Sequence, residues 1–132
     1  MKRITVTVAV ATLPLSGFAA PPSTPQQKIT GVFSDLRQIP SEGDVVGTEV
    51  FLAYAGSAYF VLLQCAQGRI GTPELLPAIV RYPQLEFGIP ANTATHCPTG
   101  DFRGTLSNRG LRGSVQGKEW PSFLPRKRSF WQ

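Results

Sequence analysis

The sequence predicts an all-β domain, built as a small antiparallel meander of about seven or eight strands with one disulfide bond. From Ile29 onward, short runs rich in valine, isoleucine, phenylalanine and tyrosine alternate with glycine, proline and asparagine, a spacing typical of sandwiches and barrels. No segment keeps helical spacing of its apolar residues for three turns. An open sheet leaves edges that proteins close or cover, so a small barrel or sharply curled sheet is the first expectation and a β-sandwich the alternative.

The first residues have the layout of a secretory signal peptide. A basic start at Lys2 and Arg3 precedes an apolar run, Ile4 to Leu15, and small residues that end at Ala20. The apolar run is shorter than the roughly 20 residues that a membrane-spanning helix needs. We therefore expect export to the periplasm or the extracellular space.

The expected organisation has three parts. Residues 1–20 are the signal peptide, and residues 21–28 form an extended leader without apolar periodicity. Residues 29–132 form a single β domain with a modest core, and we expect no transmembrane segment in this mature chain.

The first strand is expected within Ile29 to Leu36, and Gly43 with Asp44 turns the chain into the second. If Gly56 and Ser57 form a two-residue turn, the next hairpin has a definite register. One face then pairs Tyr54 with Tyr59, Leu52 with Val61 and Val50 with Leu63, and the other, solvated face pairs Glu49 with Gln64.

A second register follows from a four-residue loop, Ser107 to Gly110. It sets Leu106 against Leu111, Gly104 against Gly113 and Phe102 against Val115, with polar residues on the opposite face. The hairpin that joins Ala78–Val80 to Leu85–Ile89 keeps an open register, because Pro83 cannot take the positive φ of tight hairpin turns. The segment Ser129–Trp131 is a candidate last strand.

Cys65 and Cys97 are the two cysteines of the chain. In an exported protein such a pair normally forms a disulfide, and closing a loop of about 33 residues stabilises a fold by about 3 to 4 kcal/mol. The chain has neither a redox motif of two cysteines separated by two residues nor ligands at zinc spacing. We expect no metal site and no cofactor.

The pair of Gly104 and Gly113 would leave a strip of bare backbone between larger residues. This strip is either a slot for a ligand or a bed for an aromatic ring such as that of Trp120 or Trp131. Packing of a ring across cross-strand glycines is known in sheets, so the second interpretation is favoured.

No catalytic constellation stands out. Glu49 and Glu86 resemble the acid pair of glycosidases only in residue type, because both are expected on the solvent face, where Arg81 can pair with Glu86. His96 is the single histidine, and it lies beside Cys97 without a neighbouring acid. The sequence therefore predicts a protein that is not an enzyme.

Positive charge is concentrated at the C-terminus. Residues 101–132 contain seven Lys and Arg against two Asp and Glu, whereas residues 21–100 contain four against six. The candidate binding surface comprises Gly104, Gly113, Arg103, Arg112, Arg126, Lys127, Arg128 and Trp131. The cations and aromatic rings of the tail either attach the protein to an anionic envelope surface or pack against the sheet, and packing is favoured.

The expected function is that of a non-enzymatic binding or structural module of the bacterial envelope, whose partner is an envelope protein or an anionic envelope surface. The alternative is an inhibitor of an extracellular or periplasmic hydrolase, by analogy with other small disulfide-bonded β domains. Without Lys2 and Arg3, 11 basic residues face 8 acidic ones. This modest charge on an exported protein excludes nucleic acid as the expected partner.

Overall fold

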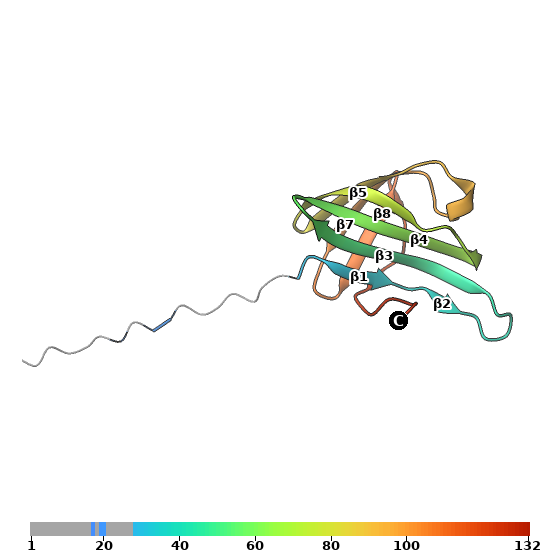
Figure 1. The fold of residues 1–132 in the computed structure, drawn as a ribbon, viewed down its shortest axis with the longest axis horizontal. Helices are drawn as coiled ribbons and strands as arrows, with labels where there is room; N and C mark the ends of the chain where they lie inside the picture. The colour runs from blue at the N-terminus through green and yellow to red at the C-terminus, as the bar shows by residue number, and fades with distance from the viewer. Residues whose placement is uncertain (1–16, 18, 21–27) are drawn as a thin grey trace, which may run out of the picture.

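A single antiparallel sheet forms the body of the protein, shown in Figure 1. The computed structural model describes residues 17, 19, 20 and 28–132. The expected signal peptide and leader therefore lie almost wholly outside the described residues. Among the described residues, no helix has the length and apolar character needed to cross a membrane.

In the described part of the chain, ten strands and one 3-10 helix follow one another. They are β1 (Gly31–Ser34), β2 (Arg37–Gln38), β3 (Val45–Ala55), β4 (Ala58–Ile70), β5 (Glu74–Arg81), β6 (Gln84–Ile89), η1 (Thr93–Thr95), β7 (Gly100–Leu106), β8 (Gly110–Val115), β9 (Lys118–Glu119) and β10 (Leu124–Pro125). The spatial order is β1-β3-β4-β5-β6-β7-β8-β10, with β2 beside β3 and β9 beside β8. The predicted meander is confirmed.

The sheet curls until its two ends meet. An isolated antiparallel bridge pairs Phe33 of β1 with Arg126, which directly follows β10, and the Lys127 N–H donates a 3.1 Å hydrogen bond to the Val32 carbonyl. Figure 1 shows β8 and β7 passing behind β3 and β4, so that the curled sheet encloses its own core. The predicted curled sheet is confirmed, and the sandwich alternative is wrong.

Both predicted hairpin registers are confirmed. Glu49 opposes Gln64 and Leu52 opposes Val61 in the first hairpin, and Gly104 opposes Gly113 in the second. The register that the sequence left open sets Ile79 against Glu86, Val80 against Leu85 and Arg81 against Gln84. Tyr82 and Pro83 therefore form a two-residue connection.

Alternate residues of the longer strands point inward and build one hydrophobic core. Its buried members come from both halves of the meander: Phe33, Val50, Leu52, Val61, Leu63, Cys65, Leu76, Leu85, Phe87, Ile89, Phe102, Leu106, Leu111, Val115 and Leu124. The Phe87 and Phe102 rings stack with their centroids 4.4 Å apart. Residues from β1, near one end of the chain, and from β10, near the other, share this core, so the domain closes as one unit.

The two ends of the sheet compare differently with the sequence prediction. The expected first strand is present as β1, which lies within Ile29 to Leu36, and β2 follows after a break at Asp35, whose carboxylate accepts a 2.6 Å hydrogen bond from the Thr48 N–H. Gly47 sits opposite this break with φ of 115°, and a Cβ there would lie 2.6 Å from the Asp35 carbonyl oxygen. The prediction of a last strand at Ser129–Trp131 is wrong, because Phe130 and Trp131 lie in a turn.

Candidate functional site

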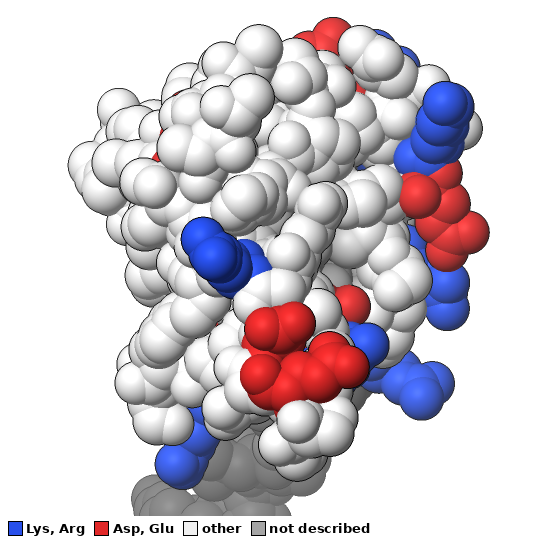
Figure 2. Space-filling view, turned by 90° about the vertical axis from the view of Figure 1, so that its right-hand side faces the viewer, with Lys and Arg blue, Asp and Glu red and all other residues white. Residues whose placement is uncertain are grey.

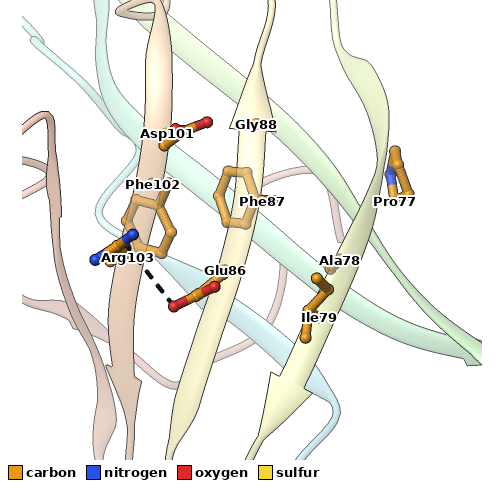
Figure 3. Close-up of a pocket in the computed structure, with 9 residues that line it drawn as sticks. All are labelled: Pro77, Ala78, Ile79, Glu86, Phe87, Gly88, Asp101, Phe102 and Arg103. Atoms are coloured by element: carbon orange, nitrogen blue, oxygen red, sulfur yellow. Dashed lines mark ion pairs between the residues drawn. The ribbon is translucent and has the colours of Figure 1, made fainter.

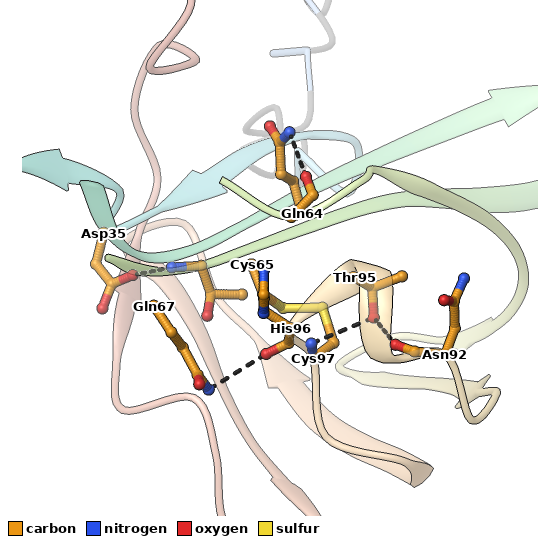
Figure 4. Close-up of a disulfide and its surroundings, with 10 residues drawn as sticks. Asp35, Gln64, Cys65, Gln67, Asn92, Thr95, His96 and Cys97 are labelled. Carbon is orange, nitrogen blue, oxygen red and sulfur yellow. Dashed lines mark hydrogen bonds between the residues drawn. A yellow bond between two sulfur atoms is a disulfide. The ribbon is translucent and has the colours of Figure 1, made fainter. Parts of the chain in front are cut away.

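The predicted disulfide joins β4 to the loop after η1, with the Cα atoms of Cys65 and Cys97 5.4 Å apart (Figure 4). The loop is ordered around Thr95, whose Oγ1 donates to the Asn92 carbonyl at 2.8 Å and accepts from the Cys97 N–H at 3.2 Å. His96 is exposed, and its carbonyl accepts a 3.3 Å hydrogen bond from the Gln67 amide. The disulfide prediction is confirmed. Both sulfur atoms are in the bond, which ties the loop after η1 to β4.

The glycine pair of β7 and β8 is a bed for an aromatic ring, but the ring belongs to Phe102. A Cβ on Gly104 would come within 2.7 Å of the Phe102 ring, and one on Gly113 would come closer still. Trp120 meets the same ring edge-on at 6.4 Å between centroids. Because Phe102 is fully buried, the strip between the glycines is occupied from inside the core and is not a ligand slot.

The arginines of β7 and β8 lie on the outer face. The Arg103 Nε lies 3.9 Å from the Glu86 carboxylate, in an ion pair whose members are largely exposed. This contact replaces the expected one with Arg81, because Arg81 opposes Gln84 in the register. The Arg112 guanidinium lies over the Phe123 ring, 5.1 Å from its centroid.

Arg126 has a structural position at the seam between β1 and β10. Its guanidinium donates hydrogen bonds to the carbonyls of Lys28 (2.5 Å), Thr30 (2.7 Å) and Ser107 (3.4 Å). The same group lies over the Phe33 ring, 4.5 Å from the centroid. Desolvation by burial lowers the pKa of Arg126 from its ordinary value, and Tyr82 acts in the opposite direction.

The C-terminal tail packs on the outer face of β3 and β4. The Glu49 carboxylate accepts hydrogen bonds from the Ser129 hydroxyl (2.5 Å) and the Phe130 N–H (2.8 Å), and the Trp131 indole N–H donates to the Gln64 side chain at 2.8 Å. Glu49 is only 7% exposed. Glu49 lies on the outer face as the register predicts, but its expected exposure to solvent is wrong, because the tail covers it.

The structure does not bring the candidate binding residues together on one surface. The two glycines lie beneath the Phe102 ring, Arg103 and Arg112 project outward from β7 and β8, and Arg126 is engaged at the seam. Lys127 and Arg128 are exposed at the start of the tail.

A different surface, which the sequence reasoning missed, is continuous across three strands. We call it the apolar outer face: Phe51, Ala53, Phe60, Leu62, Leu75, Pro77 and Ile79. The ladder sets Phe51 against Leu62 and Leu62 against Leu75, so their side chains form a row across β3, β4 and β5. The exposed fraction is 42% for Phe51, 40% for Leu62, 67% for Leu75 and 55% for Ile79.

The signal for this face was present in the composition of the strands. Residues 50–54 and 59–63 are apolar at every position rather than at alternate ones. Such continuous runs are typical of strands that are covered on both faces. In this sheet the inner face of each run lies in the core, whereas, among the residues that the structure describes, only the tail lies against the outer face, at its border.

A cavity of about 370 Å³ adjoins the apolar outer face, where β5 and β6 separate. We call this opening the β5–β6 split. Figure 3 shows its two sides: Pro77, Ala78 and Ile79 on β5 face Glu86, Phe87 and Gly88 on β6, with Asp101 and Arg103 on the strand beyond. Its volume is within the range of ligand-binding pockets.

Charge is dispersed on the end of the molecule seen in Figure 2. Basic and acidic side chains form small separate groups there, with a wide uncharged area between them. A hollow of about 230 Å³ near the disulfide is lined by polar groups that include Asp35, Gln67 and His96. Within the described part of the chain, no three His, Cys, Asp or Glu residues are grouped as metal ligands. Comparisons with protein-family models, with curated proteins and with solved structures found no match.

Proposed function

We propose that this protein is an exported, non-enzymatic binding module of the bacterial envelope that binds a partner protein through the apolar outer face. The observation that carries the proposal is the uninterrupted row of exposed Phe51, Leu62 and Leu75. Soluble monomers rarely expose contiguous apolar patches of this kind, and where they do, the patch usually marks an interaction site.

The composition of the face fits a protein partner. The core of a protein–protein interface is depleted of charge and enriched in aromatic residues, with polar groups at the rim. The apolar outer face contains two phenylalanines and no charged residue. At its borders lie the Gln64–Trp131 hydrogen bond on one side and the Glu86–Arg103 ion pair on the other.

The remaining polar groups favour binding over catalysis. The Glu49 carboxylate is occupied by the two donors of the tail, and Glu86 faces an arginine at the surface. Neither carboxylate faces the other across a cleft as glycoside hydrolysis requires. Inhibition of a hydrolase is a special case of the same proposal, in which the partner is an enzyme.

The test is capture of a partner by the immobilised mature chain from an envelope extract, at low and high salt. The captured protein is identified, purified and titrated against the wild-type chain and against a variant that combines Leu62→Ser with Leu75→Ser. Ile70→Ser is the matched control, because Ile70 is 38% exposed at the far end of β4. We expect binding that resists salt, is lost in the double variant and is kept in the control.

Two outcomes would contradict the proposal. Undiminished binding by the double variant would show that the apolar outer face is not the interface. Binding to anionic vesicles that fades with salt and depends on Lys127 and Arg128 would favour a lipid surface, because such binding relies on cations near the headgroups.

A further inference from the structure

The ladder between β5 and β6 stops early. It contains Ile79–Glu86, Val80–Leu85 and Arg81–Gln84, and the same register would continue with Ala78–Phe87, Pro77–Gly88 and Leu76–Ile89. These three pairs are absent, although β5 continues to pair with β4 and β6 with β7 along this stretch. Each strand therefore has an open edge toward the β5–β6 split.

The direction of the backbone groups at this edge follows from one hydrogen bond. The Leu106 N–H donates to the Pro83 carbonyl at 2.7 Å, and in an antiparallel ladder the side to which a residue directs its N–H and C=O alternates along the strand. The odd-numbered residues of β6 therefore face β7, and the even-numbered ones face β5. Gly88 directs both its N–H and its C=O into the β5–β6 split.

Pro77 explains why this position is open. It stands opposite Gly88 in the continued register, and proline has no N–H to donate to a ladder. Within sheets, proline is accordingly confined to edges and bulges. The N–H and C=O of Gly88, which is exposed, are thus left for another strand, and the absence of a side chain on glycine allows a second backbone to approach closely.

The walls of the β5–β6 split are chemically different. Pro77 and Ile79 of the apolar outer face form one wall, and Asp101 lies on the other, with its Oδ1 3.7 Å from where a Cβ on Gly88 would stand. Glu86 and Arg103 complete this second wall. Two carboxylates against one guanidinium give it a negative balance, which suits a cation.

We propose that the β5–β6 split binds an extended segment of the partner as an added strand. The segment hydrogen-bonds to the backbone of Gly88, places an apolar side chain against Pro77 and a lysine or arginine beside Asp101. Strand addition of this kind takes its affinity from backbone hydrogen bonds and its specificity from alternate side chains. The inference rests on the proposed function and names the form in which the partner is recognised.

The probe is a blocked heptapeptide of alternating valine and lysine, with a glutamate-for-lysine version and a version N-methylated at the central residues as controls. Binding to the full mature chain is followed by amide NMR. We expect the lysine peptide to shift the Gly88 amide signal and to slow its hydrogen exchange. The N-methylated peptide should bind at least about tenfold more weakly, since a tenfold change corresponds to one lost hydrogen bond of typical strength. The glutamate peptide should also bind more weakly, because its carboxylates would meet Asp101 and Glu86.

Pro77→Val is the decisive variant, because it restores an N–H opposite Gly88 and allows the β5–β6 ladder to close without removing an apolar side chain from the outer face. We expect it to fold, to protect the Gly88 amide without peptide and to lose peptide binding. Pro73→Val is the matched control, because Pro73 is exposed before the start of β5 and does not line the β5–β6 split, and it should keep peptide binding. Asp101→Asn should reduce the preference for the lysine peptide over the glutamate peptide.

Each result decides between the two proposals. Peptide binding that survives Pro77→Val, or signals that shift only on Phe51, Leu62 and Leu75, would overturn strand addition and leave the apolar outer face as the interface. Absence of binding by all three peptides at millimolar concentration would also overturn it. The protein could also have twice the mass of one chain in the absence of peptide. If Pro77→Val abolished this doubling, a second copy of the chain would fill the β5–β6 split, which would contradict the proposed partner.

Discussion

Glu49 and Ser129 lie 80 residues apart in the sequence, and the Ser129 hydroxyl donates a 2.5 Å hydrogen bond to the Glu49 carboxylate. The next residue, Phe130, donates its N–H to the other carboxylate oxygen at 2.8 Å. Hydrogen bonds to an ionised acceptor are stronger than neutral ones. These two hydrogen bonds therefore fix the C-terminal tail to the middle of β3.

The first prediction concerns this carboxylate. Glu49→Gln puts an amide NH₂ against one of the two donors under the tail, so we expect the free energy of unfolding to fall by about 1 to 3 kcal/mol. Urea denaturation measures this. The control is Glu86→Gln, whose side chain is 45% exposed and whose ion pair is 3.9 Å long, and it should change stability by less than about 0.5 kcal/mol. Equal losses in both variants would contradict the role of Glu49.

The second prediction is the effect of deleting residues 129–132. Phe130 is half-buried and Trp131 is 55% exposed, so the loss is smaller than that of two core aromatic side chains, which would be about 3 to 5 kcal/mol each. The deletion also exposes the Glu49 carboxylate to water. Water can then donate the hydrogen bonds that Ser129 and Phe130 supply in the intact chain. We expect a loss of about 1 to 2 kcal/mol in urea denaturation, and an unchanged midpoint would contradict packing of the tail.

Local chemistry explains which parts of the fold were predictable from the sequence. A turn at Gly56 or a loop from Ser107 to Gly110 fixes the pairing of the strands it joins, so both registers could be worked out in advance. The burial of Glu49 could not, because its cover comes from residues 80 positions away. No local pattern reports a contact between segments so far apart in the chain.

The candidate site was less predictable than the fold. The glycine pair was recognised as a place for an aromatic ring, but the ring belongs to Phe102, which also stacks on Phe87. Such packing among core side chains is not visible in the sequence. The predicted binding surface followed the basic residues, because charge is visible in a sequence. The predicted register already places Leu62 on the face of Glu49 and Gln64, but the position of Leu75 beside it depends on the pairing of β4 with β5, which no predicted turn fixed. The extent of the apolar outer face was therefore not visible in the sequence.

The third prediction tests the packing of the Phe102 ring. Gly113→Ala would place a methyl group inside the ring's contact distance, and overpacking a core costs about 1 to 3 kcal/mol. Gly88→Ala is the matched control, because its Cβ would make only a 3.7 Å contact, with Asp101. Thermal unfolding should show a lower midpoint for Gly113→Ala alone. A midpoint at or above the wild-type value would mean that the ring does not rest on this glycine.

The fourth prediction concerns the disulfide. Replacing both Cys65 and Cys97 by alanine should lower the free energy of unfolding by about 3 to 4 kcal/mol, because the unfolded chain regains the freedom of a loop that spans 32 positions. Urea denaturation of the oxidised wild type and the double variant measures the difference. Alkylation of the native wild type without reductant should label neither sulfur, and ready labelling of both would contradict the bond.

The last prediction concerns the seam where the sheet closes. Between β1 and β10 a single bridge, Phe33–Arg126, is supported by the Lys127–Val32 hydrogen bond, so the Arg126 side chain supplies much of the remaining contact. Its planar guanidinium donates to the carbonyls of Thr30 and Lys28 at the same time. A lysine has a single ammonium group in place of the planar fork and does not reproduce this pair of hydrogen bonds.

We expect Arg126→Lys to lower the free energy of unfolding by about 1 to 3 kcal/mol, as for lost hydrogen bonds from a charged donor. It should also speed hydrogen exchange at the Lys127 amide before amides of β4 are affected, since opening would begin at the weakest ladder. Arg112→Lys is the control, because Arg112 is exposed and stacks on Phe123 at 5.1 Å, and it should leave the Lys127 amide unchanged. Uniform faster exchange across the sheet in Arg126→Lys would show that Arg126 stabilises the domain as a whole and that the seam is not its weakest point.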